Sequence, residues 1–275
     1  HTRYISVTGV QTCALPILDQ VAKLTSKQIA ALSTSQLVSL TASQIDALTT
    51  AQVSKLTAEQ ITAMTTAQIR AIATDDLQSL TASQLQSVTT DGIKALTADQ
   101  VTALTTSQIS KLSVDQVGKL SASQVQAIGT DNLKQLTNDQ IAALTTTAVK
   151  GMSVDQLSVI TTAQLVNLTT SQISVLTADQ IAGLTTAQVG KLTDVQVGAL
   201  TSSQVKVIET IDLQQLTAAQ LQAITTTAVK AMTVDQMTAI TTAQIDKFTE
   251  AQVGVLSAAQ VQSIATADVV KLTNS

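Results

Sequence analysis

The sequence predicts an all-α fold, a solenoid built from very short helices with one helix in each eight-residue repeat. The phrase Leu-Thr-x-x-Gln-[Ile/Val/Leu]-x-x returns without a phase slip from Leu24 to Leu272. With the positions labelled a to h and Leu48 at a, all 32 a positions are apolar, 28 b positions are Thr or Ser, and 24 of the 31 e positions are Gln. A fixed period of this kind sets the architecture before any local feature does.

The period of eight excludes longer regular elements. In one continuous α-helix, each repeat would rotate the apolar pair a and f by about 80° and spread it around the surface. In one strand, a and f would lie on opposite faces, because they are an odd number of residues apart. We therefore expect a helix that restarts in every repeat, with an octapeptide β-solenoid carrying a ladder of Gln side chains as the alternative.

The residues at b and e have the spacing of a capping box. A Thr or Ser hydroxyl at the N-cap accepts from the N3 amide, and a Gln at N3 returns to the N-cap amide. With b as N-cap, a and f become the apolar pair that staples the helix start. Thr105 is therefore expected to cap its helix, whereas Thr106, at c, is expected to be exposed and dispensable. Asp and Glu at c and d, and Lys at g and h, suit the same helix direction through the helix dipole.

The segment His1–Ile17 departs from this pattern and contains the only His, Cys and Pro of the chain. Within it, Val7–Ile17 resembles the translation of a common sequencing-adaptor oligonucleotide, which implies read-through at the edge of an assembled metagenomic fragment. We expect an artefactual or disordered leader over residues 1–17, with a partial signal peptide or a cap as the alternative. Residues 18–275 are expected to form one octapeptide-repeat solenoid, truncated at both ends.

Seven repeats lack Gln at e, and their order along the chain is regular. Four of them also lose the hydroxyl at b and carry Thr at c; their e residues are Asp76, Asn132, Asp212 and Asp268. In these four we expect the N-cap to slip to the Thr at c and the helix to shorten. The other three follow two repeats later, with Gly92, Ala148 and Ala228 at e. The first four are separated by 7, 10 and 7 repeats, which fits either a duplicated segment or a superhelix with about 3.4 repeats per turn.

The composition offers little for catalysis. Beyond the leader there is no His and no Cys, so imidazole and thiolate chemistry are not expected. Asp75 and Asp76 form the one adjacent carboxylate pair of the repeat, and without a glycine-containing calcium-loop spacing we expect a solvated helix start there. Phe248, at an a position, is expected in the core. We expect no enzyme activity and no catalytic, cofactor-binding or metal-binding residues.

The charge pattern limits the possible partners. The net charge is −4 and only 12% of residues are charged, so there is no basic patch that could hold phosphates. Thr and Gln interrupt every apolar run, so no membrane insertion is expected. We also expect no nucleic-acid partner and no small-molecule substrate, whereas an unknown protein partner is possible.

Two resemblances bear on function. The phrase at Leu120–Ile128 is similar to the first helix of the repeats in TAL-effector DNA-binding proteins, but the repeat length, second helix, base-reading pair and positive charge of that family are absent. The whole tandem array resembles tracts in very large, repetitive bacterial exoproteins and adhesin-like surface proteins. That resemblance implies an extracellular or cell-surface location and a non-catalytic role as a spacer or stalk. The alternatives are a protein-binding α-solenoid scaffold and a module that adsorbs to ice or another surface through its Thr array.

Deleting His1–Ile17 is predicted to leave the helix content and the melting temperature unchanged, because this segment carries none of the repeat's pairings. Far-UV circular dichroism at increasing temperature measures both quantities. A melting temperature several degrees lower after the deletion would instead identify the leader as a genuine N-terminal cap.

Overall fold

A computed structural model describes residues 18–265 and residue 268. Every regular element in these residues is an α-helix, which confirms the all-α solenoid and makes the β-solenoid alternative wrong. The chain divides into two compact units, His1–Leu104 and Thr105–Ser275, and each is described by itself. The expectations for the leader and for the chain's ends concern residues outside the described ones and stay predictions, as does a single solenoid over residues 18–275.

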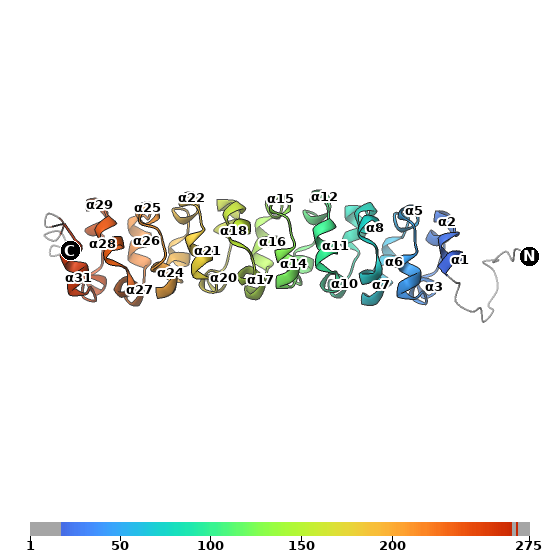
Figure 1. Cartoon of the computed structure of the whole chain (residues 1–275), viewed down its shortest axis with the longest axis horizontal. Helices are drawn as coiled ribbons and strands as arrows, with labels where there is room; N and C mark the ends of the chain where they lie inside the picture. Colours follow the sequence, from blue (N-terminus) through green and yellow to red (C-terminus); the bar gives the residue numbers. More distant parts are fainter. Residues whose placement is uncertain (1–17, 266–267, 269–275) are drawn as a thin grey trace, which may run out of the picture. The chain divides into compact units, whose positions relative to one another are not determined.

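The described part contains one helix for each repeat (Figure 1). In the first unit the helices are α1 (Leu18–Ala22), α2 (Ser26–Ala30), α3 (Thr34–Val38), α4 (Ala42–Asp46), α5 (Thr50–Val53), α6 (Ala58–Ala63), α7 (Thr66–Ala71), α8 (Thr74–Ser79), α9 (Ala82–Gln86), α10 (Thr90–Ala95) and α11 (Ala98–Ala103). In the second unit they are α12 (Thr106–Ile109), α13 (Val114–Val117), α14 (Ala122–Gln126), α15 (Thr130–Leu133), α16 (Asn138–Ala143), α17 (Thr146–Lys150), α18 (Val154–Val159), α19 (Thr162–Leu165), α20 (Thr170–Ser174), α21 (Ala178–Ala182), α22 (Thr186–Val189), α23 (Asp194–Gly198), α24 (Ser202–Val205), α25 (Thr210–Leu213), α26 (Ala218–Ala223), α27 (Thr226–Ala231), α28 (Val234–Ala239), α29 (Thr242–Ile245), α30 (Glu250–Val253) and α31 (Ala258–Ser263).

Each helix starts where the capping residues place it, and α20 shows the pattern. Thr169 has an extended backbone, and its hydroxyl accepts from the Gln172 N–H at 3.2 Å. The Thr169 N–H donates in return to Gln172 Oε1 at 2.7 Å. The same reciprocal pair forms in every described repeat from α2 onward that has Thr or Ser at b and Gln at e, including Thr105 at the start of α12. The predicted capping register is therefore confirmed.

The core is a thin column of side chains from positions a and f. Ile173 at f and Leu176 at a are both buried, and the same two positions are buried through most of the described chain. Phe248 is buried too, as its a position predicts. Most of the e glutamines lie equally deep, so most repeats place one polar side chain beside two apolar ones.

The helices pack against partners three places along the chain. In the first unit α4 packs on α7 and α8 packs on α11; in the second α14 packs on α17 and α23 packs on α26. Hydrogen bonds from the e glutamines reach back 28 to 31 residues, close to four repeats. Each unit is therefore a coil with between three and four repeats per turn. Within the second unit, α15 and α25 lie along the same edge (Figure 1), as a superhelix with about 3.4 repeats per turn requires.

Successive turns fit together by matching residue size at positions c and h. Gly183, at h, lies against Val154, the c residue of the repeat three places earlier, and a Cβ at Gly183 would overlap Val154 Cγ1. Gly151 and Ala122 are related in the same way, and a Cβ at Gly151 would lie 2.8 Å from the Ala122 Cβ. At these two places a Cβ at h would therefore compete for space with the c residue three repeats earlier.

The expected slip of the N-cap is wrong. In α8, α15 and α25 the N-cap is still the b residue, namely Ala73, Gly129 and Glu209, although none of them makes a side-chain cap. The following Thr is the first residue of each helix; α8 has six residues, and α15 and α25 have four, the same length as regular helices such as α22. Burial of the flanking a and f residues fixes the register, because a slip of one residue would rotate both out of the core.

The contact between Val154 and Gly183 predicts a conditional effect of one substitution. Gly183→Ala should destabilise the protein by about 1–3 kcal/mol, because the stiff β-branched Val154 cannot yield easily. In a Val154→Ala background the same change should be neutral or stabilising by up to about 1 kcal/mol, since Gly183 has right-handed helical angles that suit Ala. Urea unfolding of the original protein, the two single variants and the double variant gives the coupling energy between the two positions. Equal effects of Gly183→Ala in both backgrounds would contradict the predicted contact with Val154.

Candidate functional site

The glutamine at e is the most connected side chain of the repeat, and Gln188 shows its three contacts. Its Oε1 accepts from the Thr185 N–H at 2.8 Å and completes the capping box of α22. Its Nε2 donates to the Leu157 and Ile160 carbonyls of the preceding turn, at 2.8 Å each. The side chain is only 2% exposed, so these bonds are shielded from water. One carboxamide thus starts a helix and joins two turns.

These turn-to-turn bonds form a ladder, and each glutamine that bridges two turns is called a rung below. In the second unit the rungs run without interruption from Gln156 to Gln204, at Gln156, Gln164, Gln172, Gln180, Gln188, Gln196 and Gln204. In the first unit they include Gln52, Gln60 and Gln68.

The bridging role was not predicted from the sequence, which suggested only capping. A signal was nevertheless present, because e is Gln in 24 repeats and Glu in none. Glu would serve a capping box equally well. Only the amide, however, has N–H groups to donate to carbonyls.

Three of the repeats with Asp or Asn at e replace the rung by a bond to a threonine. The Thr50 hydroxyl donates to Asp76 Oδ1 at 2.6 Å, and Thr242 donates to Asp268 Oδ2 at 3.3 Å. Thr106 pairs with Asn132 Oδ1 at 2.9 Å. Thr106 is exposed as expected, but this bond argues against its being dispensable.

The adjacent carboxylates at the start of α8 have different environments. Asp75 is exposed, as a solvated helix start requires. Asp76 is buried and held by Thr50 from the preceding turn, so the expectation of a solvated helix start is wrong for Asp76. The position of Asp76 at e, which faces the preceding turn, explains the difference.

The remaining repeats without Gln lack any such replacement bond. Asp212 is 3% exposed, and its Oδ1 has no hydrogen-bond partner. Ala148 and Ala228 are fully buried, and their backbone N–H groups donate to the hydroxyls of Thr145 and Thr225. The helices therefore keep their N-terminal caps at these two repeats but have no amide that could reach the preceding turn.

The charges serve the ends of the helices. Glu59 lies in the first turn of α6, where its own backbone N–H and, to a smaller extent, the Thr57 hydroxyl lower its pKa below the ordinary value of 4.5. Because the folded pKa is lower, any stabilisation by this exposed carboxylate is present above the unfolded pKa and is lost as the pH falls through the folded one. The described residues contain two ion pairs, Lys134–Asp131 and Lys247–Asp246, both at the surface, where such pairs contribute little.

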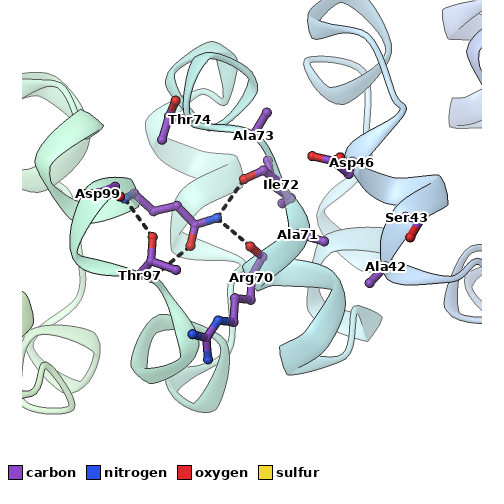
Figure 2. A pocket seen from close by; sticks show the side chains of 11 residues that line it. Ala42, Ser43, Asp46, Arg70, Ala71, Ile72, Ala73, Thr74, Thr97 and Asp99 are labelled. Carbon is purple, nitrogen blue, oxygen red and sulfur yellow. Dashed lines mark hydrogen bonds between the residues drawn. The ribbon is translucent and has the colours of Figure 1, made fainter.

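A shallow hollow of about 420 Å³ lies over α4, α7 and α11 in the first unit (Figure 2). Gln100 lines the hollow, but its amide already donates to the Ile72 and Arg70 carbonyls and accepts from the Thr97 N–H. The Arg70 guanidinium points away from Gln100 and from Asp46 (Figure 2). The polar groups of the hollow therefore do not converge on one point, as the groups of a ligand site would.

The described residues contain no group of three or more His, Cys, Asp or Glu side chains that could hold a metal ion. In the same part of the chain, no helix combines the length and the apolar character needed to cross a bilayer. The expectations of no catalytic, cofactor-binding or metal-binding residue and no enzyme activity stay predictions.

Comparison with known families gives one result. A model of a family described as the ALTTAQ repeat matches residues 21–58, 69–106, 109–146, 136–170, 149–186, 160–194 and 205–242. These segments together cover more than half of the chain, and the six letters of the description stand at Ala47–Gln52. A search of curated proteins found no match. The matches identify a repetitive structural module.

The capping geometry predicts opposite outcomes for two neighbouring threonines. Thr169→Ala should cost about 1 kcal/mol of unfolding free energy, because it removes the acceptor for the Gln172 N–H. Thr170→Ala, at the exposed c position of the same helix, should change stability by less than about 0.5 kcal/mol. Urea unfolding measures both changes in unfolding free energy. Equal losses in the two variants would contradict the assignment of Thr169 as the N-cap.

Proposed function

Because this chain belongs to the ALTTAQ repeat family, we propose that it acts as a non-catalytic spacer or stalk within a larger secreted or cell-surface protein of bacteria. The observation that carries the proposal is the ladder of glutamine rungs. The length of a spacer must scale with the number of repeats. Each added turn must therefore be able to pack on the turn before it. The rungs meet this need, because a rung such as Gln188 bonds to the start of its own helix and to the preceding turn.

The outer surface of the repeat also suits a spacer. Positions c, d, g and h are mostly Ala, Ser, Thr, Lys and Asp, and in the described residues the hydroxyls at b are largely engaged in capping. Such a surface is soluble and varies little from turn to turn, whereas recognition sites usually concentrate aromatic residues and Arg. The engagement of the b hydroxyls also reduces what a Thr array could offer to ice or another surface.

A second candidate function is the binding of a protein partner. It is favoured by Val195 and Ile211, which are 70% and 56% exposed, the highest values among the large apolar side chains of the described residues. Both lie at d, on α23 and α25. A partner that used them would recognise fixed places in the array, whereas a spacer function depends only on repeat number.

An in-phase deletion separates the two functions. Removal of Leu184–Val207 takes out three repeats, joins Gly183 to Ile208 and eliminates Val195. The splice keeps Gly183 opposite Val154. It also brings Thr162 to the same sequence separation from Asp212 that Thr50 has from Asp76, the pair that forms a hydrogen bond between turns. We expect a cooperatively melting protein whose longest dimension, measured by small-angle X-ray scattering, is shorter by somewhat less than one turn of the coil.

The matched control removes the shorter segment Leu184–Ser203 and leaves half a repeat at the junction. It should lose the capping box of α24 and melt at a lower temperature than the in-phase deletion, although it is longer. A spacer requires that the activity of the whole protein change gradually with the number of repeats removed. Abrupt loss of a binding activity on the in-phase deletion, restored only by that segment, would support the partner-binding function instead.

A further inference from the structure

The ladder of rungs is interrupted twice within a short part of the second unit. Gln204 and Gln236 each bond to two carbonyls of the preceding turn, at 2.8–2.9 Å. Between them, Gln220 keeps its bonds to that turn, but Asp212 and Ala228 make none. The repeats from Ile208 to Ala231 are called the seam below. Two of the three e residues in the seam are therefore not rungs.

The interruption leaves carbonyl groups of the preceding turn without their usual donors. At a regular rung the amide donates to the f and a carbonyls 31 and 28 residues earlier, as Gln204 does to Ile173 and Leu176. The same offsets from Asp212 reach Ile181 and Leu184, and a carboxylate offers these carbonyls no amide N–H. The Ile181 carbonyl keeps the Leu184 N–H as its backbone donor, whereas the buried Asp212 Oδ1 has no hydrogen-bond partner.

The helices of the seam are otherwise built like their neighbours. The f residues Leu213 and Val229 are fully buried, and their N–H groups donate to the b carbonyls at 3.0 and 2.9 Å. Val189 and Ile173, in repeats that rungs join to both neighbouring turns, are buried and make the same bonds at 3.0 and 2.9 Å. The loss in the seam therefore lies between turns and not within helices.

We propose that the seam is a built-in opening point of the stack, where adjacent turns separate before the turns joined by the uninterrupted rungs from Gln156 to Gln204. Bonds between turns hold short helices that have little stability of their own, so fewer bonds mean a higher population of locally opened states. The inference deepens the proposed spacer function, on which it rests, because a spacer under tension would extend first at the seam. Loss of two hydrogen bonds per missing rung corresponds to a population difference of about tenfold or more.

Amide hydrogen exchange of the whole chain tests the proposal. The N–H groups of Leu213 and Val229 are compared with those of Val189 and Ile173, which have the same position in the repeat and the same backbone bond. We expect exchange about tenfold or more faster at the two seam residues, under conditions in which exchange reports the equilibrium of local opening. Equal rates at all four would overturn the proposal.

Two substitutions move the effect in opposite directions. Ala228→Gln completes a Thr-x-x-Gln capping box with Thr225 and supplies a rung, so it should slow exchange at Val229 to the rate of Val189. Gln188→Ala removes a regular rung and should speed exchange at Val189 by a similar factor. Ala219→Gln, which adds the same side chain at an exposed position within the seam, serves as the control and should change neither rate.

The exchange experiments test the opening of the seam independently of the proposed spacer function. If the larger side chain of Ala228→Gln disrupts folding, Gln188→Ala alone decides, because it only removes atoms. Unchanged exchange at Val189 in Gln188→Ala would overturn the role given to the rungs. The exchange rates do not depend on what the chain connects, so a failed in-phase deletion with a confirmed seam would reject the spacer and leave the opening point intact.

Discussion

A carboxamide at e has one oxygen that accepts and one nitrogen with two hydrogens to donate, and the repeat uses these groups in two directions at once. In α21, Gln180 Oε1 takes the Thr177 N–H at the start of its own helix. Its Nε2 reaches the Met152 carbonyl of the preceding turn at 2.7 Å. A helix of four to six residues is too short to be stable in water by itself. The start of each helix and its attachment to the preceding turn therefore depend on the same buried side chain.

The thinness of the core follows from this arrangement. Each repeat contributes its a and f side chains to the apolar column, and in most repeats the third inward position is occupied by the amide. The aliphatic residues at a and f vary little in volume, which suits a column that has the same width at each turn. Phe248 is the one aromatic residue of the repeat at an a position, and it is accommodated without leaving the core. Size varies more at the outer positions, where Gly183 at h leaves room for Val154 at c of the adjacent turn.

The features that could be predicted from the sequence are those set by residues within one repeat. The spacing of Thr169 and Gln172 predicts the N-cap, and the period of eight predicts where the helix must restart. The features that could not be predicted depend on residues of the preceding turn, several repeats away in the sequence. The burial of Asp76 results from Thr50 on that turn, and the b residue remains the N-cap of α8 because the core fixes the register. Capping rules consider only the neighbouring residues, so they suggested a slip that the stack does not allow.

The pairing of c with the h residue three repeats later has a consequence for how such an array can change through recombination. Repeats with nearly the same letters invite unequal crossing-over, which adds or removes repeats in whole numbers. A single repeat inserted between Val154 and Gly183 would place Val154 opposite Val175 instead of Gly183, because each pair of repeats that spans the insertion is shifted by one place. A copied block longer than one turn preserves most of its internal c and h partners, and only its two junctions have to be compatible. Selection for fit between turns therefore favours the inheritance of long blocks, and the recurring spacing of Asp76, Asn132, Asp212 and Asp268 is the pattern that such inheritance leaves.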